Sequence, residues 1–193
     1  MQGAFCVYFI SMKRTNVLIK RLTFSLNSGT IIINNSEFKG GENMVSAVNV
    51  ANNILQKGFN TENDITPMKL QKLTYLVFKK YYQDTQTILF PERFEVWKYG
   101  PVVRSIYNEF KKYGGNVIRE YGKDLDGSIL IVNEVASPQF KNALDTIWKK
   151  YGEYGGIPLS EMTHRQGTAW YKAVQRKDLY LSNEDIKEEE VFL

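Results

Sequence analysis

The segment 94–113 restricts the possible folds of this chain more than any other part of the sequence. A short β-prone run at 94–97 precedes the pair Gly100-Pro101. Gly100 can take backbone angles that are closed to residues with a Cβ, and proline suits the first helical position because an N–H there would be unpaired. Apolar residues then follow at helical spacing: Val103, Ile106, Tyr107, Phe110 and Tyr113. The pattern predicts a strand, a tight corner at Gly100 and a helix from Pro101 to Tyr113.

The composition is that of one globular domain. The chain has 193 residues, of which 43% are hydrophobic and 24% are charged, which is enough for a sizeable core. No apolar run approaches the roughly 18–20 residues of a membrane-spanning helix, so we expect no membrane association. One cysteine, Cys6, and one histidine, His164, cannot form a disulfide framework or a Cys/His metal cluster. We therefore expect a cytoplasmic protein with no metal and no cofactor.

The charge is distributed unevenly along the chain. Its formal net charge is +4 at pH 7, which by itself would favour a nucleic-acid partner. Five of its 25 basic and two of its 21 acidic residues lie in 1–43, so that 20 basic and 19 acidic residues remain in 44–193. Because 44–193 is nearly neutral, nucleic-acid binding is not the function we expect. A DNA-binding regulator or autorepressor of its own operon is kept as the alternative function.

Residues 1–43 show neither a helical nor an alternating pattern, and their charges do not follow the order of a secretory signal. The tripeptide 39–41, Lys-Gly-Gly, can be encoded by AAA-GGA-GGA, which resembles a bacterial ribosome-binding sequence. Only two residues separate this tripeptide from Met44. We therefore expect Met44 to be the true start and 1–43 to be a translated leader, with a genuine N-terminal extension as the alternative. The functional domain would then be 44–193.

The clearest helix in the sequence begins at Thr66-Pro67, where Thr66 can cap the first turn and Pro67 suits its start. Its apolar stripe consists of Leu70, Leu73, Val77 and Tyr81. Four lysines occupy other positions of the helix: Lys69, Lys72, Lys79 and Lys80. We expect these lysines on the solvated face, where lysines of amphipathic helices usually lie. A phosphate-binding stripe is the alternative.

The remainder of 44–193 completes a mainly α-helical α+β fold, a compact helical domain with small β-hairpin elements. Further helices are predicted at 45–57, 138–151, 158–164, 168–175 and from Ser182 onward. Gly58 is expected to end the first of them. A hairpin is predicted at 88–99 with its turn at Pro91-Glu92, and a second β element at 116–134 with its strand at 128–132.

His164 is the one residue that suggests catalysis, because Ser160 and Glu161 lie close to it in the sequence. A hydrolase would need the histidine within hydrogen-bond reach of a nucleophile or an orienting carboxylate. A structural histidine near a helix end explains the same residues more simply. We therefore expect no catalytic residue, and keep a hydrolase built on His164 as a third hypothesis.

Three segments, taken together, resemble the Panacea antitoxin family, which includes SocA-like proteolytic adaptors and phage-associated GepA-type proteins. Residues 69–75 resemble its K-L-Q-K-L-x-Y helix, residues 97–103 with Tyr107 its W-x-Y-G-P-V core, and residues 159–164 with Trp170 its L-S-x-x-T-H…W segment. The residues that carry the resemblance are Lys69, Leu70, Lys72, Leu73, Tyr75, Trp97, Tyr99, Gly100, Pro101, Val102, Tyr107, Leu159, Ser160, Thr163, His164 and Trp170. Ala169 and Arg104 stand where the family often has proline.

The resemblance implies a non-enzymatic antitoxin that neutralises a toxin encoded by a neighbouring gene, by direct binding or by delivery to the ClpXP protease. It also implies that the motif residues are mainly scaffold, so that the choice of toxin lies in variable surfaces. Our candidates for these surfaces are the 116–134 element and the terminal helix 185–193. A role in a partner surface is also left open for four tyrosines: Tyr82, Tyr99, Tyr113 and Tyr154.

Overall fold

The structure is a computed structural model that describes residues 45–124 and 127–190, and four short strands closer to the N-terminus. These strands form two antiparallel pairs: β1 (Phe9–Lys13) with β2 (Asn16–Lys20), and β3 (Ser25–Leu26) with β4 (Gly29–Thr30). Cys6, the tripeptide 39–41 and Met44 lie outside the described residues. The start at Met44 therefore stays a prediction.

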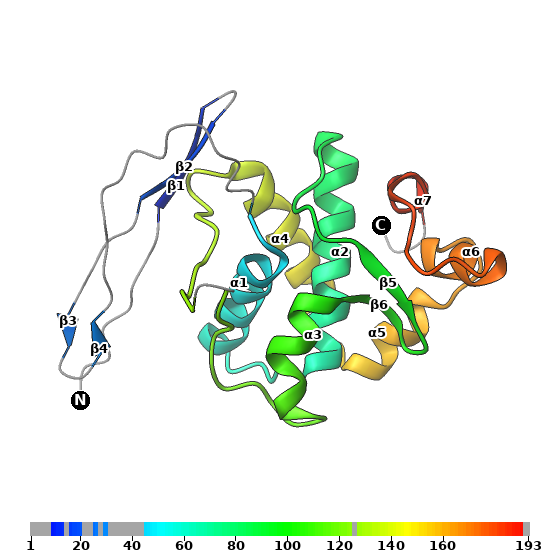
Figure 1. Ribbon diagram of the computed structural model, residues 1–193, viewed down its shortest axis with the longest axis horizontal. Helices are drawn as coiled ribbons and strands as arrows, with labels where there is room; N and C mark the ends of the chain where they lie inside the picture. Colours follow the sequence, from blue (N-terminus) through cyan, green and yellow to red (C-terminus); the bar gives the residue numbers. More distant parts are fainter. Residues whose placement is uncertain are drawn as a thin grey trace.

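Helix α2 (Pro67–Thr85) is the centre of the fold (Figure 1). It begins as predicted, because the Thr66 side chain accepts a hydrogen bond from the Lys69 N–H and Pro67 occupies the first turn. Around it lie α1 (Ala47–Asn60), α3 (Arg104–Phe110), α4 (Pro138–Tyr151), α5 (Gly156–Thr163) and α7 (Asn183–Glu188). Every residue from 69 to 79 is buried, so this helix runs through the core.

The prediction of a solvated lysine face on α2 is wrong. Lys69, Lys72 and Lys79 are buried, because other elements cover the helix on all sides. Each ammonium group ends on oxygen atoms: Lys69 Nζ lies 2.6 Å from Asn63 Oδ1, and Lys72 Nζ lies 2.8 Å from the Pro101 carbonyl. A phosphate-binding stripe on this helix is thereby also ruled out, since three of its four lysines do not reach the surface.

The corner at Gly100 is confirmed, but the elements on either side of it differ from the prediction. Gly100 has a φ of +97°, which favours glycine. It begins strand β6 (Gly100–Val103), which pairs antiparallel with β5 (Phe94–Trp97), so the turn of the hairpin is at 98–99 and not at Pro91-Glu92. The predicted helix start at Pro101 is wrong, because α3 begins only at Arg104, and its last turn is the 3-10 helix η1 (Lys111–Tyr113).

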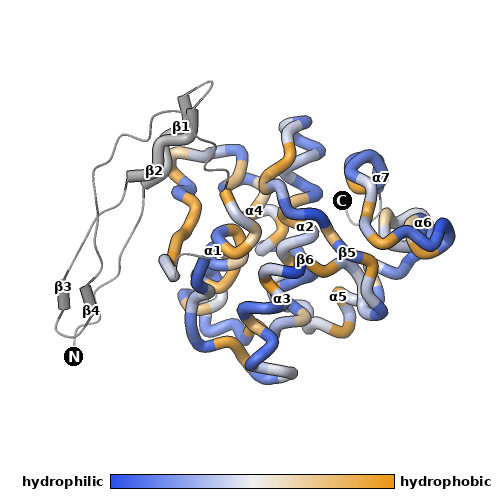
Figure 2. The backbone as a smooth tube through the Cα atoms, in the orientation of Figure 1, coloured by the Kyte–Doolittle hydropathy of each residue, from blue (hydrophilic) through white to orange (hydrophobic). Residues whose placement is uncertain are grey.

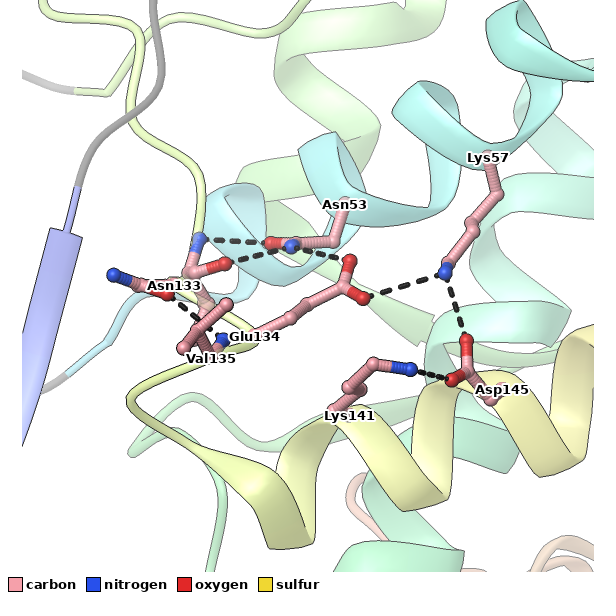
Figure 3. Close-up of polar contacts among 8 residues, drawn as sticks. Asn53, Lys57, Asn133, Glu134, Val135, Lys141 and Asp145 are labelled. Carbon is pink, nitrogen blue, oxygen red and sulfur yellow. Dashed lines mark hydrogen bonds and ion pairs between the residues drawn. The ribbon is translucent and has the colours of Figure 1, made fainter.

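The predicted β element at 116–134 is also wrong, because its described residues, 116–124 and 127–134, form no strand. Two asparagines of α1 take the place of a partner strand. The Asn53 side chain accepts from the Val132 N–H and donates to the Val132 carbonyl, both at 2.8 Å (Figure 3). Asn52 makes the same pair of bonds to Gly122, at 2.7 and 2.9 Å. The segment is therefore irregular in form while its backbone is hydrogen-bonded to a helix.

The other helices lie close to their predicted positions, and the mainly helical α+β class is confirmed. α4 ends at Gly152, α6 spans Ala169–Arg176, and Ser182 caps α7. The prediction that Gly58 ends the first helix is wrong, because α1 continues to Asn60. Gly58 is packed against Ile65, whose Cγ1 would lie 2.7 Å from a Cβ at that position, so close packing explains this glycine. Hydrophobic and hydrophilic residues alternate along α1 and α4, as expected for helices with one face in the core (Figure 2). Among the described residues, no helix has both the length and the apolar character needed to cross a membrane.

Candidate functional site

The three sequence motifs meet at the β5–β6 hairpin, although they are far apart in the sequence. The hairpin lies between α2, which carries the first motif, and the α5–α6 pair, which carries the third (Figure 1). The second motif forms the hairpin itself. The structure therefore brings residues of all three segments together around one small sheet, although Lys69 binds Asn63 and Asp64 in the loop before α2 instead.

On the α2 side, side chains replace a neighbouring strand for β6. The Gln71 amide accepts from the Val103 N–H at 2.9 Å and donates to the Val103 carbonyl at 3.1 Å. Lys72 Nζ donates to the Pro101 carbonyl at 2.8 Å. Pro101 can lie in this strand because β6 is an edge strand and proline has no N–H to leave unpaired. The helix thus fixes the outer edge of the hairpin.

On the α5–α6 side, two side chains hold the backbone of the turn. Ser160 Oγ donates to the Tyr99 carbonyl at 2.8 Å, and Trp170 Nε1 donates to the Trp97 carbonyl at 2.9 Å. Gly100 lies against Thr163, whose Oγ1 would be 2.4 Å from a Cβ added at position 100. The close approach and the positive φ together explain why glycine is needed at the corner.

The interior of this junction perturbs two titratable groups. Burial lowers the pKa of Lys72 to about 7. Burial and the nearby Lys72 charge lower the pKa of His164, whose ring lies 3.9 Å from that of Trp170. His164 Nε2 is buried with no hydrogen-bond partner. Because the Ser160 hydroxyl donates to the Tyr99 carbonyl, the nucleophile–base pair of the hydrolase hypothesis is not formed.

Aromatic side chains and an arginine lie on the hairpin and in the first turn of α3. We call Trp97, Tyr99, Arg104 and Tyr107 the hairpin face. Tyr99 is 55% exposed and Tyr107 is 38% exposed. The rings of Trp97 and Tyr107 lie 4.7 Å apart in an edge-to-face arrangement, and the Arg104 guanidinium lies 4.9 Å over Trp97.

Glu95 organises the hairpin face from the neighbouring position. Its carboxylate accepts from Arg104 Nε at 3.0 Å, from Arg104 Nη2 at 2.6 Å and from Trp97 Nε1 at 2.7 Å. Partial burial raises the pKa of Glu95, but these hydrogen bonds outweigh it and hold the pKa below its usual value. Arg104 and Trp97 are therefore fixed relative to one another before any partner arrives.

Residues 179–181 extend the sheet on the free side of β5. The Val96 N–H donates to the Leu179 carbonyl at 3.0 Å, and the Leu181 N–H donates to the Phe94 carbonyl at 2.9 Å. Leu179 is 78% exposed and Tyr180 is 39% exposed. The apolar surface beside the hairpin face is thus continued by this segment.

The two surfaces favoured for partner choice differ in their exposure. In the terminal segment, the helix ends earlier than predicted, because α7 stops at Glu188. Ile186 in this helix and Glu189 directly after it are buried. In the other segment, Glu134 pairs with Lys57, which also binds Asp145 at 2.7 Å (Figure 3). Beside this network Val135 is 81% exposed. The segment 116–134 therefore still offers an exposed surface, whereas buried side chains of the terminal segment pack within the chain.

Comparison with known proteins identifies the family. Residues 70–171 match the family described as "Antitoxin SocA-like, Panacea domain", and the chain belongs to it. Over 129 residues the chain is 30% identical to Antitoxin SocA of Caulobacter vibrioides (strain NA1000 / CB15N), a match that covers 65% of this chain and 69% of that protein. No solved structure matches the chain.

Sequence reasoning missed three sets of residues that build this region. Gln71 lies inside the first motif, but a glutamine on a helix usually faces solvent, so its position does not indicate a contact with β6. The adjacent pair Asn52-Asn53 lies in the middle of a helix, where asparagine is unfavourable, and this was an available signal. Glu189 lies in an acidic run that resembles a solvated tail, and no pattern around it indicates burial.

Proposed function

We propose that this protein is a non-enzymatic antitoxin that acts in the cytoplasm and neutralises a toxin encoded by a neighbouring gene through direct binding by the hairpin face. The observation that carries this proposal is the contrast between backbone and side chains at the turn. The carbonyls of Trp97 and Tyr99 are held by Trp170 and Ser160, while the Tyr99 side chain is 55% exposed.

Such an arrangement suits protein recognition. Tryptophan, tyrosine and arginine are enriched among the residues that dominate the binding energy of protein interfaces. The two aromatic side chains offer large contact areas with few rotatable bonds. Fixing the turn in advance lowers the entropy lost on binding. Arg104 is likewise held by Glu95, so its guanidinium is presented in one orientation.

Growth rescue tests the proposal. The neighbouring gene would be induced in a bacterial host together with the wild-type protein, with the double variant Tyr99→Ala/Tyr107→Ala, or with Tyr154→Ala. Tyr154 is 43% exposed and lies after α4. It is one of the four tyrosines left open for a partner surface, but it is not part of the hairpin face, so it serves as the control that separates the two surfaces. We expect the wild type and the control to restore growth and the double variant to fail while keeping its melting temperature. Equal rescue by all three proteins would remove the hairpin face from the interaction.

The same strains distinguish occlusion of the toxin from its delivery to a protease such as ClpXP. If binding alone neutralises the toxin, its amount stays unchanged when growth is restored. Delivery to a protease would lower that amount, and the rescue would fail in a host without ClpXP. The alternative of an operon regulator predicts salt-dependent binding to the promoter of the protein's own operon, and a retardation assay with that DNA tests it.

A further inference from the structure

The side chain of Glu189 ends in a pocket between α2 and α6, where the residue is fully buried. Its Oε2 accepts hydrogen bonds from Tyr75 Oη and from the Ala169 N–H, both at 2.6 Å. Its Oε1 lies 3.1 Å from Lys79 Nζ. We call the three donors, Tyr75 Oη, Lys79 Nζ and the Ala169 N–H, the carboxylate pocket.

The carboxylate pocket is matched to one kind of ligand. Its donors are a phenol, an ammonium group and a peptide N–H in the first turn of α6, where the helix dipole favours negative charge. Burial, followed by the charge of Glu189, raises the pKa of Tyr75 well above its usual value, so the phenol remains a donor. Burial lowers the pKa of Lys79, and attraction to Glu189 opposes that change.

Burying an ion pair of this kind costs desolvation free energy, so it is an unusual way to attach a terminal segment. The side chains of Lys79 and Glu189 are only 1% and 0% exposed, and apolar side chains of similar volume would often be equally stabilising. What a carboxylate adds is a specific bond to the first turn of α6. The segment is held further by Gln83, whose Nε2 donates to the carbonyls of Lys187 and Glu189 at 2.9 Å.

We propose that the carboxylate pocket is a binding site for a carboxylate group, that Glu189 is its intramolecular ligand, and that this contact latches the C-terminal segment 183–190 onto α6 and so holds the hairpin face in place. The residue of α6 that binds Glu189 is the neighbour in sequence of the residue that binds the hairpin. Ala169 directly precedes Trp170, whose indole donates to the Trp97 carbonyl at 2.9 Å. Glu189 is thus a positioning residue for the hairpin.

The same helix start is tied to α5, which strengthens the connection. Thr168 caps α6 by accepting from the Tyr171 N–H at 3.0 Å, and its hydroxyl donates to the Thr163 carbonyl at 2.8 Å. The inference depends on the proposed function only for the role of the hairpin face. The pocket itself is tested without a toxin, so that failure of the latch and failure of the antitoxin proposal can be told apart.

The first test uses the full chain with Glu189→Ala, which empties the pocket. Glu190→Ala is the matched control, because Glu190 is the exposed neighbour and its loss changes the net charge equally. Glu189→Ala should melt roughly 10 °C below the wild type, as expected when a buried ion pair loses one partner, and the control should melt with the wild type.

Rescue by a small carboxylate then tests whether the pocket is a binding site. Sodium acetate at neutral pH should raise the melting temperature of Glu189→Ala more than that of the wild type or of Glu190→Ala. Sodium chloride at the same ionic strength should show no such preference. An equal response of the three proteins to acetate, or an equal effect of both salts on Glu189→Ala, would overturn the proposal.

A second measurement keeps the proposal testable if Glu189→Ala does not fold. Glu189→Gln keeps the side-chain volume but removes the charge, and Glu190→Gln is its control. In a nitrogen–proton correlation spectrum, the Ala169 amide reports on the pocket and the Trp170 indole reports on the hairpin. We expect Glu189→Gln to shift both resonances and Glu190→Gln to shift neither. Unchanged resonances in Glu189→Gln would refute the latch, and a shift of Ala169 alone would refute its connection to the hairpin.

Discussion

Replacing Lys72 with methionine should flatten the pH dependence of this protein's stability. Lys72 is 1% exposed, and its Nζ donates to the Pro101 carbonyl at 2.8 Å. Burial lowers its pKa to about 7, from 10.5 in the unfolded chain. Between these two pH values the unfolded chain binds one proton more than the folded protein, so the free energy of unfolding rises with pH.

The size of this effect follows from the two pKa values. Each pH unit between them adds about 1.4 kcal/mol, and the contribution levels off below pH 7, where both states are protonated. From pH 7 to pH 9 Lys72 should therefore add about 2 kcal/mol to the free energy of unfolding. Methionine fills a similar unbranched space and has no proton to release. The variant also loses the hydrogen bond to Pro101, which lowers its free energy of unfolding by a similar amount at each pH. The quantity to compare between the two proteins is therefore the change in the free energy of unfolding from pH 7 to pH 9.

Urea denaturation at pH 7, 8 and 9 measures this change. The wild type should gain about 2 kcal/mol more than Lys72→Met over that interval. Lys80→Met is the matched control, because Lys80 lies on the same helix, is partly exposed and pairs with Asp84; it should follow the wild type. Parallel curves for the wild type and Lys72→Met would show that the buried amine keeps its proton and would refute this reasoning.

Three further predictions concern the scaffold. Gly100→Val should lower the free energy of unfolding by about 3 kcal/mol, because of the positive φ and the contact with Thr163; an unchanged thermal melting curve would contradict this. Gln71→Ala should cost about 3 kcal/mol in urea denaturation, since it leaves two buried backbone groups of β6 unpaired, whereas the exposed Gln139→Ala should cost little. We also propose that a chain beginning at Met44 melts with the full-length protein, because the α1 cap needs only the side chains of Ser46 and Asn49; a large drop in melting temperature would show that 1–43 belongs to the fold.

The elements that could be predicted are those whose signals lie within a few residues of one another. The start of α2 follows from Thr66-Pro67, the start of α7 from Ser182, and the corner from Gly100, and all three are confirmed. In each case a cap, a fixed φ or a missing Cβ decides the local backbone whatever packs around it.

The elements that could not be predicted depend on side chains from distant parts of the chain. Pro101 lies in a strand because Gln71 and Lys72, about thirty residues earlier, supply partners along its edge. Residues 128–132 form no strand because Asn52 and Asn53 bind that backbone instead. Such substitutes for strand pairing leave no periodic pattern in the sequence.

The candidate site could be predicted only in part for the same reason. The three motifs were recognised, but their meeting at the hairpin depends on the tertiary fold. Lysine is rarely buried, so neither Lys72 nor Lys79 could be assigned to the interior from its position on a helix. Glu189 was expected on a partner surface, and its pocket is formed by residues from two other helices.

The most direct test of the central claim is the affinity of the purified protein for the product of the neighbouring gene, measured by titration calorimetry. We expect a tight complex with the wild type and at least about 100-fold weaker binding by Tyr99→Ala/Tyr107→Ala, as two interface hot spots would give. Tyr154→Ala should bind as the wild type does. Equal affinities of the wild type and the double variant would contradict the assignment of the hairpin face, and no binding by the wild type would contradict neutralisation by direct contact.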